Sequence, residues 1–183
     1  MRRIVVIGTS GSGKTTLARQ LADRLDLVHI ELDELHWGPN WSEPSLAEFR
    51  ARVAAAVSQE AWTLDGNYSK VRDIVWLRAD TIVWLDYSLP RIMGQLLRRT
   101  VRRSLLREEL WSGNRESLRT SFFSRDSILL WALTTYRRRR RNYPQLLALP
   151  QHSHLQVVHL RSPGETERWL ASFQSADCAD HTD

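Results

Sequence analysis

The chain has 183 residues, of which 42% are hydrophobic and 26% charged, with a formal net charge of +5 and a pI of about 10.0. This length suits one domain with a full hydrophobic core. No apolar run approaches the ~20 residues of a membrane span, and the apolar run after the N-terminal arginines is too short for a signal-peptide core, so we expect a cytoplasmic protein. The single cysteine, Cys178, excludes an internal disulfide and a thiolate metal cluster.

Strand-like and helix-like segments alternate along the chain, which favours an α/β domain with a mostly parallel sheet. We expect strands at 4–7, 28–31, 62–65, 81–85 and 155–160, and helices at 13–25, 45–57, from 88 onward, from 128 to an arginine run at 137–141, and at 162–173. Capping-box patterns, Ser45 with Glu48 and Ser162 with Glu165, begin two of these helices. One domain is predicted over 1–175, followed by a disordered polar tail at 176–183.

Residues 8–15, Gly-Thr-Ser-Gly-Ser-Gly-Lys-Thr, match the phosphate-binding pattern G-x-x-x-x-G-K-[ST] in full. The match follows a predicted strand and opens a predicted helix, so backbone N–H groups and the helix N-terminus would face phosphate oxygens. Lys14 is expected to reach the β- and γ-phosphates, and the Thr15 hydroxyl to ligate Mg²⁺. The pattern therefore predicts an ATP and Mg²⁺ site formed by Gly8, Ser10, Gly11, Ser12, Gly13, Lys14, Thr15 and Thr16.

Three aspartates follow predicted strands, at the edge where open α/β sheets bind ligands. Asp65 ends the third strand and is the candidate metal ligand beside Thr15. Asp33 ends the second strand and is the second candidate functional carboxylate. Asp86 ends the fourth. Each aspartate could instead cap the turn that follows it.

Several segments together resemble the adenylate-kinase-like P-loop kinases. They are the phosphate loop, Leu-Asp-Glu-Leu-His-Trp at 32–37, Leu-Asp-Gly-Asn-Tyr at 64–68, the segment 79–86, and Leu-Trp-Ser-Gly-Asn-Arg-Glu at 110–116. Within that class the chain is most similar to small bacterial DNA topology modulation, or flagellar-regulation-associated, proteins. The resemblance implies a three-layer α/β/α sandwich, a five-stranded parallel sheet in the order 2-3-1-4-5, and a helical lid at about 103–125.

The resemblance also implies site residues. Arginines that flank the lid hold the nucleotide and the transferring group, and the matching positions are Arg98 and Arg102 before it and Arg137 after it, with the register of the 137–141 run left open. Nucleoside monophosphate kinases carry a Ser-Thr-Gly-like segment at the place where this chain has Asp33. An aspartate there is more similar to shikimate and gluconate kinases, whose acceptors are hydroxyl compounds. The candidate substrate residues are Asp33, His36, Trp37, Asn67, Tyr68 and Arg72.

Two functions fit these patterns. The first is ATP- and Mg²⁺-dependent phosphoryl transfer to a small molecule, nucleoside or nucleotide. The second is an ATP-binding regulatory protein that acts on DNA, and a kinase of modified DNA bases would combine the two. The predicted arginines bracket the lid and do not form one continuous stripe, which favours the kinase; the acceptor and the oligomeric state stay open.

Overall fold

The structure is a computed structural model that describes residues 1–106, 109–114 and 128–173. The tail at 176–183 and most of the expected lid lie outside these residues. Of the lid range, residues 103–106 belong to a helix, and residues 109–114 form a short described segment. No helix in the described part of the chain is long and apolar enough to cross a membrane.

Five parallel strands form the sheet: β1 (Arg3–Gly8), β2 (Val28–Glu31), β3 (Trp62–Asp65), β4 (Thr81–Leu85) and β5 (Gln156–Leu160). Their order is β2-β3-β1-β4-β5, which confirms the predicted topology. β3 and β4 are buried along their whole length, as expected of strands covered on both faces. The central position of β1 places the loop after it in the middle of the carboxyl edge.

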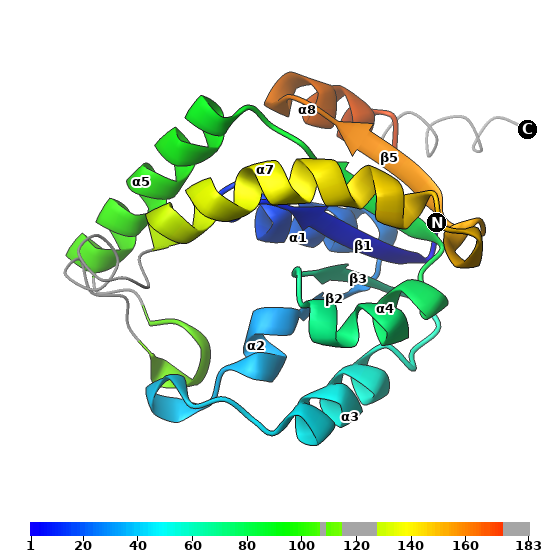
Figure 1. The fold of residues 1–183 in the computed structure, drawn as a ribbon, viewed down its shortest axis with the longest axis horizontal. Coiled ribbons are helices and arrows are strands. Elements are labelled where there is room, and N and C mark those ends of the chain that lie inside the picture. Colours follow the sequence, from blue (N-terminus) through cyan, green and yellow to red (C-terminus); the bar gives the residue numbers. More distant parts are fainter. Residues whose placement is uncertain (107–108, 115–127, 174–183) are drawn as a thin grey trace, which may run out of the picture.

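Helices cover both faces of the sheet (Figure 1). They are α1 (Lys14–Leu25), α2 (Leu32–His36), α3 (Leu46–Ala56), α4 (Arg72–Arg78), α5 (Leu89–Leu106), α7 (Ile128–Leu147) and α8 (Pro163–Ala171). On one face, α3, α4 and the second half of α7 enclose a core around Phe49, Trp62 and Trp76. On the other face, α1, α8 and the start of α5 enclose a core around Leu21, Ile92 and Leu170.

Both predicted capping boxes begin a helix. The Ser45 hydroxyl accepts a hydrogen bond from the Glu48 N–H at 3.2 Å, and Ser162 accepts one from Glu165 at 3.2 Å. Each hydroxyl satisfies one of the backbone donors that the first helical turn leaves without an intrahelical partner. The helices α3 and α8 therefore begin at the residue after each serine, as expected.

The sequence pattern missed two helices and misplaced the end of a third. Neither α2 nor α4 was predicted, because helices of 5 and 7 residues are too short to show an apolar period. Asp33 consequently lies in the first turn of α2 and does not end β2, so its predicted strand position was wrong. The helix α7 continues through the arginine run to Leu147, since arginine favours helices and the buried Tyr143 packs this part against the sheet.

Candidate active site

The loop at 8–13 joins β1 to α1 and lies against α5. Gly11 and Gly13 have φ of 85° and 90°, a region that side chains with a Cβ rarely adopt. A Cβ on Gly11 would also lie 2.9 Å from Leu96 Cβ, so α5 leaves no room for one. The structure buries Gly8 and Ser12, half-buries Ser10, Gly11, Lys14 and Thr15, and exposes Gly13 and Thr16. The open N-terminus of α1 at Lys14 fits an anion.

Asn67 fixes the start of this loop. Its amide nitrogen donates to the Gly8 carbonyl at 2.6 Å, and its amide oxygen accepts from the Gly8 N–H at 3.3 Å. The Tyr143 hydroxyl of α7 donates to the same oxygen at 3.1 Å. Asn67, expected among the substrate residues, thus joins the segment after β3 to the phosphate loop and α7.

Asp65 lies beside the loop because β3 pairs with β1 in parallel register, Val6 opposite Asp65. The Thr15 hydroxyl donates to Asp65 Oδ2 at 2.6 Å, and His29 Nε2 lies 2.9 Å from Oδ1. A threonine hydroxyl and a carboxylate are hard oxygen donors of the kind that Mg²⁺ prefers. The pair predicted to hold the metal, Thr15 and Asp65, is therefore together and of suitable chemistry.

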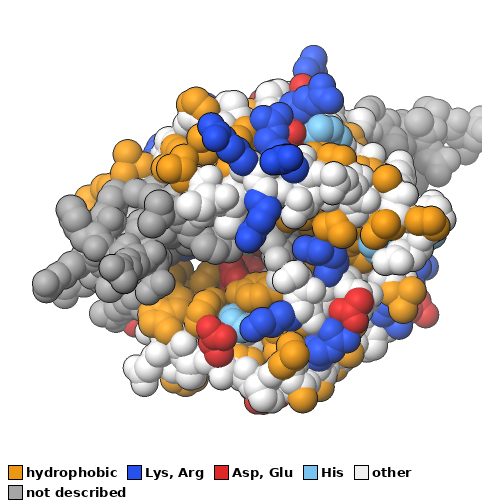
Figure 2. All heavy atoms as spheres, viewed as in Figure 1, with side chains coloured by type: hydrophobic (Ala, Val, Ile, Leu, Met, Phe, Trp, Pro, Cys, Tyr) orange, Lys and Arg blue, Asp and Glu red, His pale blue; other side chains and the backbone are white. Residues whose placement is uncertain are grey.

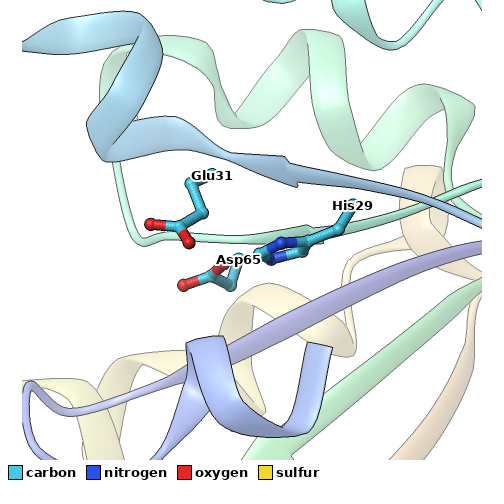
Figure 3. A group of neighbouring side chains, drawn as sticks. All are labelled: His29, Glu31 and Asp65. Carbon is cyan, nitrogen blue, oxygen red and sulfur yellow. Dashed lines mark hydrogen bonds and ion pairs between the residues drawn. The ribbon is translucent and has the colours of Figure 1, made fainter. Parts of the chain in front are cut away.

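His29, Glu31 and Asp65 place one possible ligand atom each within 4.8 Å of one another, and Figure 3 shows their side chains converging from β2 and β3. Both oxygens of Glu31 already have donors. One pairs with Arg19 of α1, and the other accepts from the indole Nε1 of Trp111 at 2.9 Å. Glu31 thus serves as an anchor for these two side chains, and the hard oxygen donors for a metal are those of Thr15 and Asp65.

Asp33 is oriented by Tyr68. The phenol hydroxyl donates to Asp33 Oδ1 at 2.6 Å, and no other described side chain bonds the second oxygen, Oδ2. Burial, and then the charge of Asp33, raise the pKa of Tyr68 well above its ordinary value, so the phenol stays a donor. A carboxylate with one oxygen held and one oxygen available to a ligand suits a general base.

Lys14 is the electrostatic centre of the site. Burial lowers the pKa of its ammonium to about 8, while Asp65 and Asp33 act in the opposite direction and the guanidinium groups of Arg139 and Arg99 add to the lowering. The two carboxylates and the two arginines are therefore all within electrostatic reach of the phosphate-loop lysine. Bound phosphates would stabilise these three positive charges.

The arginines whose charges lower the pKa of Lys14 are Arg99, next to the predicted Arg98, and Arg139, within the 137–141 run whose register was left open. Arg98, Arg102 and Arg137 are exposed, whereas Arg99 and Arg139 are half-buried. The signal for both was in the sequence. Arg99 continues the buried face of α5 marked by Ile92 and Leu96, and Arg139 lies between the buried Tyr136 and Tyr143 on α7. A shift of one residue turns a helical side chain by about 100°, so the register decides which guanidinium reaches the loop. Figure 2, in the same view as Figure 1, shows many Lys and Arg side chains on the face that α7 crosses.

Of the remaining predicted substrate residues, His36 and Trp37 follow Asp33 at the end of α2. His36 is buried, with its ring centroid 4.7 Å from that of Trp37 and 4.6 Å from that of Tyr68, and burial lowers its pKa. Its place among aromatic rings fits a neutral imidazole that packs. Arg72 lies at the start of α4, with its guanidinium carbon 5.3 Å from the centroid of Trp76.

Asp86 has a structural role. It is buried at the end of β4, where it accepts from Arg140 Nε at 2.8 Å and lies 3.1 Å from His159 Nε2. These contacts attach α7 and β5 to the end of β4. A cleft of about 380 Å³ lies nearby, beyond the carboxyl ends of β4 and β5, and was not found from the sequence. Its lining residues are Tyr87, Ser88, Arg91, Arg161, Ser162, Pro163 and Gly164.

The sheet order agrees with the comparisons to known proteins. A family described as an AAA domain matches residues 4–172. The chain belongs to this AAA-domain family. No curated protein matches the sequence of this AAA-domain protein.

Solved structures share the fold of the AAA-domain protein. Shikimate kinase from Acinetobacter baumannii, in complex with shikimate, is 18% identical with a TM-score of 0.54, over 100% of this chain and 96% of that one. A gluconokinase from Sinorhizobium meliloti 1021 is 18% identical with a TM-score of 0.52, over 98% of both chains. Shikimate kinase from Bacteroides thetaiotaomicron is 17% identical with a TM-score of 0.53, over 96% and 97%. The residues that the structure describes therefore have the fold of P-loop kinases.

Proposed function

We propose that this protein is an ATP-dependent kinase that phosphorylates a hydroxyl group of a small molecule. The observation that carries the proposal is that the two carboxylates that act on Lys14 have different hydrogen-bond partners. Asp65 is bonded to Thr15 of the phosphate loop, whereas Asp33, at the start of α2, is bonded to Tyr68. Both act on the same lysine. This arrangement supports one carboxylate that serves the nucleotide and a second that serves the acceptor.

The nucleotide would be bound by the loop and by the half-buried arginines. Its terminal phosphates would lie at the N-terminus of α1, against Lys14, Arg99 and Arg139. Mg²⁺ held through Thr15 and Asp65 would neutralise charge on the phosphate oxygens. The nucleoside would extend along α5 to the cleft lined by Tyr87, Arg91 and Pro163, which has the size of a small-molecule site.

The transfer itself would need one proton acceptor. The hydroxyl of the acceptor would give its proton to Asp33 as its oxygen bonds to the γ-phosphorus, and the bond from that phosphorus to the bridging oxygen would break to release ADP. Asp33 would then return the proton to solvent. Lys14, Arg99 and Arg139 would stabilise the negative charge during transfer, and this positioning and electrostatic stabilisation would supply most of the rate.

A hydroxyl acceptor is favoured over a phosphate acceptor by the charge on α2. Asp33 and Glu34 occupy the first turn of this helix, on the acceptor side. Two acidic groups disfavour a phosphate monoester, and water exclusion would strengthen that repulsion. The structural neighbours named above include kinases of shikimate and gluconate, both hydroxylated acids, and such compounds are the first candidates here.

The test is a screen with ATP labelled at the γ-phosphate. The acceptors are hydroxylated acids including shikimate and gluconate, sugars, nucleosides, AMP, and DNA with and without hydroxylated bases. We expect label on a hydroxyl compound, and label released only as inorganic phosphate across the whole panel would contradict the proposal. DNA binding that falls steeply with added salt, without transfer to a small molecule, would favour the regulatory function instead. The narrower resemblance to DNA topology modulation proteins stays a prediction.

A further inference from the structure

Two segments far apart in the sequence meet beside the acceptor side of the site. One is the 37–41 loop, which follows α2, and the other is the 110–114 turn. The Asn114 side chain accepts a hydrogen bond from the Trp41 N–H at 3.0 Å and donates to the Gly38 carbonyl at 2.9 Å. The Ser112 hydroxyl donates to the Trp37 carbonyl at 2.9 Å. The turn is thus bonded to both ends of the loop.

The Asn114 side-chain amide both accepts and donates hydrogen bonds. It is 5% exposed, and besides its two bonds to the loop it donates to the Trp111 carbonyl at 2.8 Å, which closes the turn on itself. An amide is the side-chain group that both donates and accepts in this way. An aspartate of the same shape would keep only the bond from Trp41.

The backbone of both segments is in an unfavourable conformation. Asn40, Trp41 and Ser112 have φ of 54°, 58° and 56°, in the left-handed region. Asparagine tolerates this region, but tryptophan and serine pay a steric cost there. Such conformations persist where the surroundings hold them, and they concentrate at ligand-binding sites. The contacts across the two segments are the ones that hold the loop.

The same turn reaches the strand end that precedes Asp33. Trp111 donates from its indole to Glu31 at 2.9 Å, and Glu31 is paired with Arg19 of α1, the helix that opens at Lys14. Asp33 follows Glu31 by two positions, and α2 runs from there to the 37–41 loop. The turn therefore contacts the chain on both sides of the candidate base.

We propose that the 110–114 turn positions the acceptor side of the site, with Asn114 and Trp111 as positioning residues. They hold the 37–41 loop, and through it Trp37, in the form that receives the acceptor. The kinetic part of this inference rests on the proposed kinase function; the structural part does not. Loss of Asn114 raises the acceptor KM and leaves ATP affinity unchanged, because the turn's hydrogen bonds go to the 37–41 loop and to Glu31.

The first test is hydrogen exchange on the full chain without ligand. Asn114→Ala should speed exchange in the 37–42 segment by roughly tenfold, since Trp41 loses its acceptor and the strained loop loses its tie. Asn114→Asp, which retains that acceptor, should show a smaller change. Asn142→Ala, on an exposed part of α7, is the matched control and should change nothing there. Unchanged exchange in Asn114→Ala, with a normally folded variant, would overturn the inference.

The second test is kinetic, with the acceptor that the labelled-ATP screen identifies. Asn114→Ala should raise its KM about tenfold with kcat within about threefold of the parent, and Asn114→Asp should recover part of the loss. A KM that stays unchanged, or an equal loss of ATP affinity, would overturn the positioning role. Failure of the parent protein to phosphorylate any acceptor would instead overturn the proposed function, and the exchange experiment would still decide whether the turn holds the loop.

Discussion

Replacement of Lys14 by methionine should abolish phosphoryl transfer while making the free protein more stable. Methionine has a similar length and no charge, so it removes the group that would meet the terminal phosphates. We expect turnover of ATP to fall by at least ~10²-fold, the typical loss when one preorganised transition-state donor is removed. The fold should persist, because the lysine makes only a long hydrogen bond, 3.4 Å to the Thr9 carbonyl.

The gain in stability follows from the cost of burying the ammonium. The pKa of Lys14 is lowered from 10.5 to about 8, and each pKa unit corresponds to ~1.36 kcal/mol. The full difference is therefore ~3 kcal/mol at neutral pH. Because Lys14 is half-buried and solvent screens part of this cost, we expect a gain of ~1–2 kcal/mol in the free energy of unfolding.

The pH dependence of this gain has a fixed sign. Below about pH 8 the lysine is charged in both states, so the folded parent protein bears the full cost. Between about 8 and 10.5 the unfolded state binds more protons than the folded state, so the parent becomes more stable as pH rises and the gain disappears. Urea unfolding at pH 7 and pH 10 measures both values. Lys70→Met, at the only other lysine and on the surface, is the control. A Lys14→Met variant less stable than the parent at pH 7, or a gain that grows with pH, would refute this reasoning.

Three further predictions concern the metal, the arginines and the acceptor. Asp65→Asn should raise the Mg²⁺ concentration needed for half-maximal activity about tenfold or more, measured by Mg²⁺ titration, and an unchanged titration would count against its role as a ligand. Arg99→Ala and Arg139→Ala should each lower kcat by ~10²-fold or more in steady-state assays, whereas the exposed Arg98→Ala should change kcat less than about threefold. A larger loss of kcat in Arg98→Ala than in Arg99→Ala would favour Arg98 as the arginine that binds the phosphates. AMP should be a poor acceptor because of the acidic start of α2, and a kcat/KM of about 10⁴ M⁻¹s⁻¹ or more in a coupled assay of ADP formation would contradict this.

The sheet could be predicted because its signals are local. Each signal predicts the structure of its own segment from neighbouring residues. The signals are the short β-branched strands buried on both faces, the glycine loop after the first strand, and the capping boxes at Ser45 and Ser162. The order β2-β3-β1-β4-β5 came from the family resemblance. The helices α2 and α4 could not be predicted, because segments of 5 and 7 residues are too short to show a helical period of apolar residues.

The sequence predicted which residues form the site better than it predicted the contacts between them. The pattern placed Thr15 and Asp65 together, and the structure joins them by a hydrogen bond of 2.6 Å. It did not indicate that Tyr68 would orient Asp33, or that Asn67 would bond Gly8, because both contacts join segments that meet only when the sheet forms. A run of five arginines at 137–141 gives no local cue to register, and only the buried residues on either side of it place Arg139 toward the loop.

The most direct test of the account is the fate of the γ-phosphate in the parent protein and in Asp33→Asn, followed by ³¹P NMR with ATP, Mg²⁺ and the acceptor from the screen. The parent should form a phosphate ester on a hydroxyl, with one ADP for each ester. Asp33→Asn should bind ATP as tightly as the parent and form the ester at least ~10²-fold more slowly, the contribution expected of a general base. Ester formation at the parent rate in Asp33→Asn, or a loss confined to ATP affinity, would contradict the claim that Asp33 serves the acceptor.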